Sequence, residues 1–138
     1  MKRIQFLQGV AAALCLAASS TASFAQGYPT KPVRLVVPFP AGGATDLFAR
    51  TLGQKMGDKL GAMLVIDNKP GAGGAIGSDL VAKAQADGYT LLLATTSTHS
   101  IGPAITSKLP YGTVRDFSPI AHVGDAPSIM LVPVNSPA

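Results

Sequence analysis

Two neighbouring glycines, Gly42 and Gly43, stand between an apolar run at residues 33–37 and a segment that opens with Thr45 and Asp46 and has helical periodicity. The first backbone N–H groups of a helix have no partner within the helix, and the helix dipole places positive potential there. Glycines let a ligand oxygen reach these groups, so the arrangement is suited to binding an anion. The alternative is that the glycines only shape a tight connection.

The same arrangement recurs further along the chain. At residues 63–79 an apolar run is followed by a proline, a glycine-rich turn and a second helical segment. A third apolar run, residues 90–94, ends in four consecutive hydroxyl side chains and His99. Hydroxyls donate hydrogen bonds without carrying charge. The recurrence favours ligand binding over a purely structural role for the glycines.

A hydrolase is one alternative for the hydroxyl-rich stretch. Ser97 and His99, with Asp46 or Asp79 on neighbouring turns, supply the residue types of a catalytic triad. However, a serine and a histidine two residues apart in one loop rarely face each other, and the chain has no G-x-S-x-G motif. Short polar side chains at a sheet edge are more typical of ligand binding.

A dinucleotide-binding domain is the alternative for the glycines at residues 71–77. The stretch follows an apolar run and opens a helical segment, as a G-x-G-x-x-G motif does. Ile76 stands where the last glycine is needed, and Thr95 and Thr96 follow the third apolar run where an acidic residue is expected. The sequence therefore argues against this class.

The composition of the chain argues against several classes of binding partner. The chain carries a formal net charge of +4, its basic residues are scattered and it has no tryptophan, which does not fit a nucleic-acid-binding surface. His99 and His122 are isolated, and the one cysteine, Cys15, lies near the N-terminus, so we expect no metal site. We also expect no cofactor.

Residues 1–25 have the pattern of a secretory signal peptide. A basic start is followed by a short apolar run and then by small residues, with Ser23 and Ala25 at the positions that a signal peptidase requires. The apolar run is too short to span a bilayer, which takes roughly 20 apolar residues. We expect export to the periplasm with cleavage after Ala25.

Hydrophobic periodicity predicts three strand–turn–helix units. The strands are residues 33–37, 63–66 and 90–94, and the first helix ends at Gly61. Such units predict a parallel α/β sheet with flanking helices, in which all three special turns lie at the carboxyl edge of the strands. The expected buried side chains of the two helices are Phe48, Leu52, Met56 and Leu60, then Ile76, Leu80, Val81 and Ala84.

Several separated motifs resemble one known family. They are Tyr28-Pro29 through Pro32-Val33-Arg34, Val36 to Asp46 with its Pro-Phe-Pro-Ala-Gly-Gly core, Asn68-Lys69-Pro70-Gly71-Ala72-Gly73-Gly74, Asp87-Gly88-Tyr89-Thr90-Leu91 and Asp116-Phe117-Ser118-Pro119. In order and spacing they resemble the periplasmic solute receptors of tripartite tricarboxylate transporters, the Bug or TctC type. At Tyr111-Gly112-Thr113 the family tends to have Tyr-Asp-Pro, a departure that we expect to affect only a surface turn.

The resemblance implies a periplasmic binding protein-like fold of type II, whose two lobes close on a small organic acid. Such a receptor hands its ligand to the permease subunits in the membrane, is not an enzyme, and is a monomer at full length. The family's receptors are about twice as long, so the resemblance implies an incomplete first lobe here. Residues 26–119 would form the front of lobe one and residues 120–138 the strands that cross towards lobe two.

The family's three ligand loops fall on residues 39–46, 70–74 and 95–99, which we call the first, second and third ligand loops. The expected ligand-binding residues are Phe39, Ala41, Gly42, Gly43, Thr45, Asp46, Ala72, Gly73, Thr95, Thr96, Ser97, Thr98 and His99.

Asp46 needs a separate interpretation, because a carboxylate would repel an anionic ligand at close range. An acidic residue in the first turn of a helix is favoured by the dipole whatever its function, by roughly 0.3–1 kcal/mol. Asp46 therefore either binds an ammonium group or orders the loop amides from behind. We favour the second role, because the three loops contain no lysine or arginine beyond the adjacent Lys69. We expect His99 to act as a loop donor rather than as a base.

Overall fold

The computed structural model describes residues 27–127, 131 and 133–134. The expected signal peptide and most of residues 128–138, the end of the expected crossing strands, lie outside the described residues. The elements, in chain order, are β1 (Val33–Val37), α2 (Ala44–Leu60), β2 (Leu64–Asn68), the 3₁₀ turn η2 (Ala72–Gly74), α3 (Ala75–Ala82), β3 (Thr90–Leu92), the π-helical turn η3 (Ser97–Ile101) and α4 (Gly102–Ile105).

The three strands form one parallel sheet in the order β2-β1-β3. Val33 pairs with Leu64 at the start of β1, and Arg34 pairs with Thr90 on its other side. The predicted parallel sheet is confirmed, and β1 has the predicted bounds. β2 continues two residues beyond the prediction, whereas β3 ends two residues before it, because the chain turns away once Leu93 N–H has bonded to the carbonyl of Val36 (3.0 Å).

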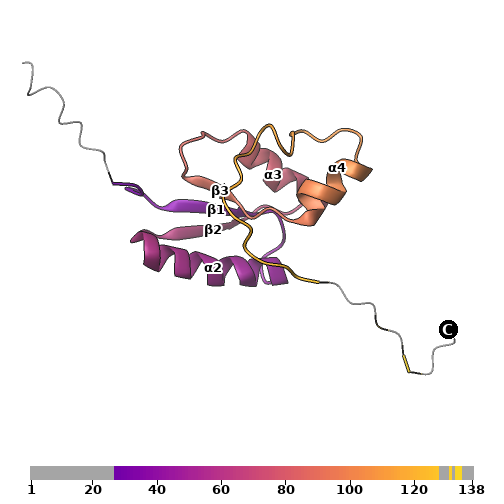
Figure 1. Ribbon diagram of the computed structural model, residues 1–138, viewed down its shortest axis with the longest axis horizontal. Helices are drawn as coiled ribbons and strands as arrows, with labels where there is room; N and C mark the ends of the chain where they lie inside the picture. Colours follow the sequence, from indigo (N-terminus) through magenta and orange to yellow (C-terminus); the bar gives the residue numbers. More distant parts are fainter. Residues whose placement is uncertain (1–26, 128–130, 132, 135–138) are drawn as a thin grey trace, which may run out of the picture.

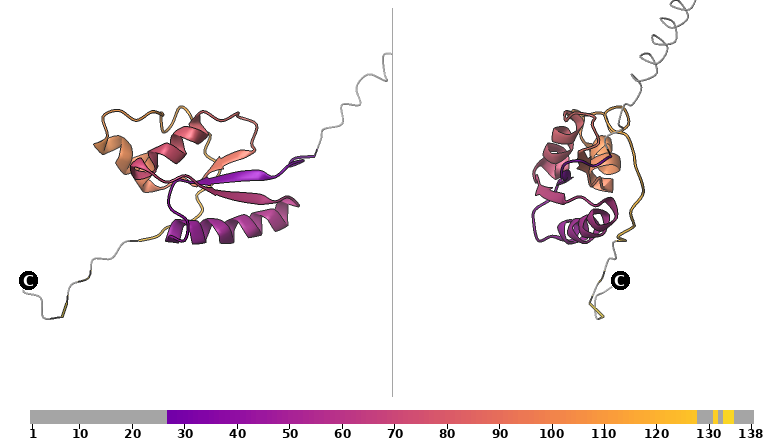
Figure 2. Two further views of the ribbon diagram at one scale, coloured as in Figure 1. Left: turned by 180° about the vertical axis from the view of Figure 1, so that it is seen from behind. Right: turned by 90° about the vertical axis from the view of Figure 1, so that its left-hand side faces the viewer.

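Helices cover both faces of the sheet. Figure 1 shows α2 on one face and α3 with α4 on the other, and the end-on view in Figure 2 shows the same layers. This arrangement follows from the strand order, because α2 connects β1 to β2 while α3 crosses β1 to reach β3. With right-handed connections the two helices must lie on opposite faces. The carboxyl ends of all three strands meet at one edge.

Small residues make the closest contacts between α2 and the sheet. Ala49 and Gly53 are buried, and a Cβ on Gly53 would lie 3.0 Å from Ile66 Cδ1. The predicted apolar stripe is therefore partly wrong, since Phe48 is 43% exposed and Leu60 is 38% exposed. Leu52 and Met56 are half-buried. The predicted C-terminal cap is confirmed, because Gly61 has left-handed backbone conformation and its N–H donates to the carbonyl of Gly57.

α3 also packs through small residues. Gly77 and Ser78 are buried, and a Cβ on Gly77 would lie 3.0 Å from Pro38 Cα. Ile76, which we expected on the buried side, is 55% exposed, whereas Leu80, Val81 and Ala84 are half-buried. The absence of a side chain at Gly77 brings the start of α3 against the end of β1. Helix packing here thus positions the second ligand loop beside the first.

The core on the α2 side consists of Leu35, Val37, Ala49 and Leu93, with Phe39, Ile66 and Leu91 packed against it. Val33 and Val36 are completely buried as well, so β1 is covered on both faces. A central parallel strand is expected to be apolar along its whole length for this reason. Phe39 continues this core into the first ligand loop.

The lead-in before β1 is tied to the turn after α3. Tyr28 donates its hydroxyl hydrogen to the carbonyl of Gly88 (2.7 Å), and the Tyr89 hydroxyl accepts from Thr30 N–H (2.9 Å). Lys31 forms an ion pair with Asp87 (3.2 Å). These contacts lie at the opposite end of the strands from the ligand loops, so they stabilise the fold without approaching the site.

The chain after β3 differs from a simple loop. η3 begins within the hydroxyl stretch, at Ser97, and α4 follows it directly. Pro103 lies in the first turn of α4, where a missing N–H costs nothing. Residues 119–127 contain neither strand nor helix, and they pass from the α3–α4 side of the sheet to the α2 side (Figures 1 and 2). The division of the chain at residue 119 stays a prediction. Among the described helices, none has the length and apolar character needed to cross a membrane.

Candidate ligand-binding site

The first ligand loop leaves the start of α2 without a side-chain cap. Gly42 has φ +82°, which turns the chain back after β1, and Gly43 is the N-cap in extended conformation (φ −76°, ψ 169°). No side chain hydrogen-bonds to the amides of this helix end. The exposed Gly43 therefore stands before a helix start whose first amides have no capping side chain, which is the geometry that binds anions.

Asp46 lies behind this loop and is only 2% exposed. Its Oδ2 accepts from Gly42 N–H (2.8 Å) and from Arg50 Nε (2.9 Å), and its Oδ1 accepts from Asn68 Nδ2 (3.0 Å). The same Asn68 amide also donates to the carbonyl of Phe39 (3.1 Å). Both carboxylate oxygens are thus occupied by protein donors. These contacts agree with the interpretation that Asp46 orders the loop rather than contacts a ligand.

This network should make the stability of the fold depend on pH in acid. The hydrogen bond from Arg50, with that from Gly42, holds the pKa of Asp46 at about 2, below its ordinary 3.8. Because the folded-state pKa is lowered, the stabilisation is complete above about pH 4 and is lost as the pH falls through about 2. The stability difference between the wild type and Asp46→Asn should therefore shrink from pH 5 to pH 2 in thermal unfolding. Asp58→Asn, on the exposed side of α2, is the control, and a difference that stays constant with pH would contradict the prediction.

The second ligand loop has an unusual backbone. Four consecutive residues have positive φ: Gly71 (+125°), Ala72 (+48°), Gly73 (+64°) and Gly74 (+95°). Gly74 N–H closes the turn on the carbonyl of Gly71 (2.9 Å), and Ser78 Oγ donates to the carbonyl of Gly74 (3.0 Å). Left-handed backbone of this kind is accessible mainly to glycine. It turns the chain sharply from β2 into α3.

Gly74 is the point at which the three ligand loops meet. A Cβ on Gly74 would lie 2.5 Å from Thr98 Cγ2 and 3.4 Å from Pro38 Cβ. Thr98 belongs to the third loop, and Pro38 directly precedes the first. The predicted meeting of the special turns at one edge is therefore observed. The glycine is required both for its backbone conformation and for this close approach.

Gly74→Ala should accordingly be strongly destabilising. A strained left-handed alanine costs about 1–3 kcal/mol, and overpacking against Thr98 adds a similar amount, so we expect a loss of at least about 2 kcal/mol in chemical denaturation. Gly73→Ala is a matched control, because Gly73 also has positive φ (+64°) but no atom lies within 4 Å of its added Cβ. Equal losses for the two variants would show that the contact with Thr98 does not matter.

The third ligand loop lies in and before η3. Thr98 is 1% exposed, and its hydroxyl donates to the carbonyl of Thr95 (3.0 Å) and accepts from Thr95 N–H (3.1 Å). His99 Nδ1 lies 2.9 Å from the same hydroxyl. The Thr98 hydroxyl gives its single hydrogen to the Thr95 carbonyl, so it can only accept from His99. The contact with His99 is therefore a hydrogen bond when Nδ1 carries the proton. Thr95 Oγ1 is buried without a hydrogen-bond partner.

His99 packs in an aromatic cluster that the sequence did not predict. Its ring lies 5.9 Å from that of Tyr111 and 4.7 Å from that of Phe117. Partial burial lowers the pKa of His99 below its ordinary value. Tyr111 is 6% exposed, whereas Gly112 and Thr113, the two positions that depart from the family's pattern, are half-buried. Our expectation that this departure affects only a surface turn stays a prediction. The sole sequence signal was the presence of two of the chain's few aromatic residues within one short segment.

The expected ligand residues fall into two groups. Some are accessible and line the edge where the loops meet: Ala41, Gly42, Gly43, Ala72, Gly73, Thr96 and Ser97. Others are buried or half-buried and hold the loops: Phe39, Thr45, Asp46, Thr95, Thr98 and His99. No catalytic triad forms among the described residues, because His99 Nδ1 contacts Thr98 while the carboxylate of Asp46 is bonded to Arg50, Gly42 and Asn68.

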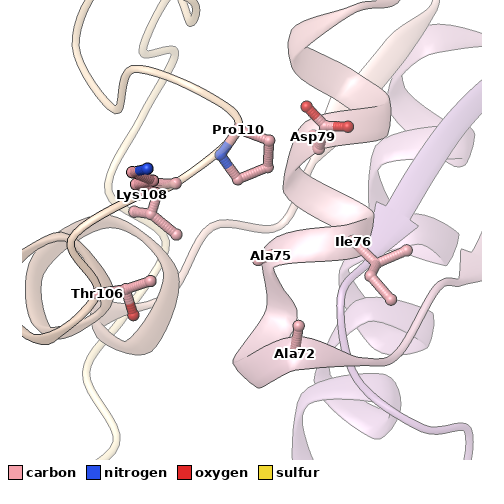
Figure 3. A pocket seen from close by; sticks show the side chains of 8 residues that line it. Ala72, Ala75, Ile76, Asp79, Thr106, Lys108 and Pro110 are labelled. Carbon is pink, nitrogen blue, oxygen red and sulfur yellow. The ribbon is translucent and has the colours of Figure 1, made fainter.

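A pocket of about 530 Å³ lies beside the ligand loops rather than among them. Figure 3 shows Thr106 and Lys108 on one side of it, with Ala72 of η2 and Ala75 of α3 on the other. It contains only one expected ligand residue, Ala72. The backbone amides at the start of α2 and the hydroxyls of the third loop lie outside it. The candidate site at the meeting point of the loops is thus separate from this pocket. Within residues 27–127 and the three further described residues, no cluster of three metal-ligating side chains occurs.

Comparison with known proteins decides the family. The family described as "Tripartite tricarboxylate transporter family receptor" matches residues 48–138. The chain belongs to this family. It is 44% identical over 108 residues to protein BugT of Bordetella pertussis, a match that covers 78% of this chain and 33% of BugT.

Solved structures of similar proteins share the fold. MatC of Rhodopseudomonas palustris with bound malate is 40% identical with a TM-score of 0.65, over 67% of this chain and 31% of MatC. The R. palustris protein Rpa4515 with adipate is 38% identical with a TM-score of 0.60, over 62% of this chain and 29% of Rpa4515. The receptor chain thus has part of a periplasmic binding protein fold, and it spans about a third of the length of the relatives that it matches.

Proposed function

We propose that the complete receptor, meaning the whole natural polypeptide in which this sequence occurs, binds a small carboxylate without transforming it. The observation that carries the proposal is the uncapped start of α2 behind Gly43, at the edge where the three loops meet. Backbone amides in this position stabilise a carboxylate through hydrogen bonds and the helix dipole. Two similar proteins were solved with malate and with adipate, which are both dicarboxylates.

In this proposal the accessible residues have different roles. Gly43 gives one ligand carboxylate access to the amides of α2, and Asp46 keeps the loop in place through Gly42 N–H. The exposed hydroxyls of Thr96 and Ser97 donate to other ligand oxygens. No arginine or lysine is needed, because amide and hydroxyl dipoles replace the water that solvates the anion. The second lobe then closes over the ligand.

Membership of the family supports a cellular role for the proposed receptor. In this proposal it is exported through the signal peptide at residues 1–25, acts in the periplasm and delivers its acid to the membrane subunits of a tripartite tricarboxylate transporter.

Calorimetry on the complete receptor tests this function. A panel of malate, adipate, citrate, aspartate and benzoate should contain at least one acid that binds saturably, with a dissociation constant on the order of micromolar or below, which corresponds to about 8 kcal/mol or more. The acid should be recovered unchanged. Thr96→Val removes one donor at nearly constant volume and should weaken binding, whereas Thr51→Val, on the exposed side of α2, should not. Absence of binding across the panel, or turnover of a bound acid, would refute the proposal.

A further inference from the structure

The segment at residues 111–117 is anchored to the third ligand loop by one buried hydrogen bond. Tyr111 donates its hydroxyl hydrogen to the carbonyl of Thr98 (2.9 Å), and the tyrosine is 6% exposed. A buried carbonyl that lost this donor would be left without a hydrogen bond from that side, at a cost larger than the bond's net contribution. The bond therefore fixes the backbone of η3 at Thr98.

Aromatic contacts hold the next residue of the loop. The ring of His99 is stacked on Tyr111 with an interplanar angle of 30° and meets Phe117 edge-on at 69°. Tyr111 and Phe117 also contact each other, with ring centroids 5.7 Å apart at 90°. Such edge-to-face pairs have preferred geometries, so the three rings restrict one another. The contacts with both rings therefore restrict the orientation of the His99 ring.

Hydrogen bonds within the segment at residues 111–117 hold its own backbone in a turn. Asp116 Oδ2 accepts from Gly112 N–H (2.7 Å), and Asp116 N–H donates to the carbonyl of Gly112 (3.1 Å). Arg115 Nε donates to Asp116 Oδ1 (2.7 Å). Residues 112–116 thus form a closed turn between the two aromatic residues. The spacing of Tyr111 and Phe117 is set by this turn.

Thr98 connects the segment at residues 111–117 to the second ligand loop and to the accessible hydroxyls of the third. Its methyl group fills the space left by the missing side chain of Gly74 in the second loop. Its hydroxyl accepts from the N–H of Thr95 and donates to the carbonyl of Thr95, the residue directly before the exposed Thr96 and Ser97. A shift of Thr98 would therefore change both the second loop and the orientation of the two accessible hydroxyls.

We infer that Tyr111 and Phe117 are positioning residues for the ligand site, which hold Thr98 and His99 so that the third loop presents its hydroxyls to the bound acid. The inference rests on the proposed function for its binding readout. Neither aromatic residue needs to touch the ligand, since each acts through a residue of the loop. The closed turn at residues 112–116 keeps the two aromatic residues at a fixed spacing.

Two variants of the complete receptor test the inference. Tyr111→Phe keeps the ring and removes only the bond to Thr98, so the affinity for the acid that binds best in the panel should fall roughly three- to tenfold. Phe117→Leu opens the edge of the cluster, so the affinity should fall and the pKa of His99, followed by NMR, should rise towards its ordinary 6.5. Phe117→Tyr retains an aromatic edge, so both the affinity and the pKa of His99 should stay close to their wild-type values. Val114→Ala is the matched control, because Val114 lies in the same segment and is 88% exposed.

The outcomes separate positioning from a general stabilising role. If Tyr111→Phe and Phe117→Leu lower the melting temperature but leave affinity and the pKa of His99 unchanged, the inference is wrong. If the wild-type receptor binds none of the acids, the proposed function fails, yet the amide NMR signals of residues 95–99 still decide the inference. Their displacement in Tyr111→Phe, but not in Val114→Ala, supports the positioning role, and unchanged signals in both variants overturn it.

Discussion

Gly43→Val in the complete receptor should abolish tight binding of the acid while leaving the fold intact. Gly43 has ordinary extended backbone, and the nearest atom to an added Cβ is the carbonyl oxygen of Pro40 at 3.5 Å. The site itself therefore tolerates a side chain. A branched side chain before α2 would, however, stand between the ligand and the helix amides. Hydrogen bonds to a charged group contribute about 1.5–3 kcal/mol each, so the loss of two should weaken binding at least about a hundredfold in calorimetry.

The contrast with Gly42 makes this experiment specific. Gly42 has φ +82°, so Gly42→Val strains the backbone and should lower the melting temperature as well as the affinity. Gly43→Val should lower the affinity alone. Gly43→Ala, with a smaller side chain at the same position, should give an intermediate loss. Binding by Gly43→Val at the parental affinity would exclude the start of α2 as the carboxylate site.

The sequence predicted well what depends on local patterns. β1 is apolar except for the half-buried Arg34, and its predicted bounds are those observed. The end of α2 at Gly61 followed from the left-handed conformation that glycine adopts at helix ends. The meeting of the three loops followed from topology, because parallel strands place all their carboxyl ends at one edge. These features need only neighbouring residues and the handedness of the connections.

The errors concern contacts that hydrophobic periodicity does not describe. Phe48 and Ile76 were expected inside because they are large and apolar, but Ala49, Gly53 and Gly77 make the closest helix–sheet contacts. Small residues let the helices approach so closely that their larger neighbours point outwards. A pattern that scores residues by hydrophobicity alone ranks these small residues too low.

Long-range contacts of the third loop were equally invisible in the sequence. The bond from Tyr111 to Thr98 joins residues 13 positions apart in a stretch without periodicity. The π-helical turn η3 arises where hydroxyl side chains bond to nearby backbone groups instead of continuing a strand. Propensity described this stretch only as rich in polar residues. Its conformation depends on the aromatic residues that arrive later in the chain.

Residues 26–138 expressed alone should self-associate, and they should bind the acid that binds best in the panel at least about a hundredfold more weakly than the complete receptor does. In the described part, β2 and β3 each pair with one strand only, which leaves two sheet edges with unpaired backbone groups. Large apolar side chains are also exposed beside β2 and on α2, including Met63 (69%), Leu47 (60%) and Val65 (44%). Exposed edges and apolar surface of this kind favour association with other chains.

The weak binding has a separate cause. The accessible amides and hydroxyls of the ligand loops lie at one edge of the described fold, so a ligand there stays in contact with water on its other side. Water weakens each hydrogen bond to the carboxylate, and the loss of about 2.7 kcal/mol corresponds to the hundredfold change. Size-exclusion chromatography followed by calorimetry measures both effects, with the complete receptor as the positive control. A monodisperse monomer of residues 26–138 that binds the same acid within tenfold of the complete receptor would show that the loops of this chain suffice for the site, and that lobe closure contributes little to affinity.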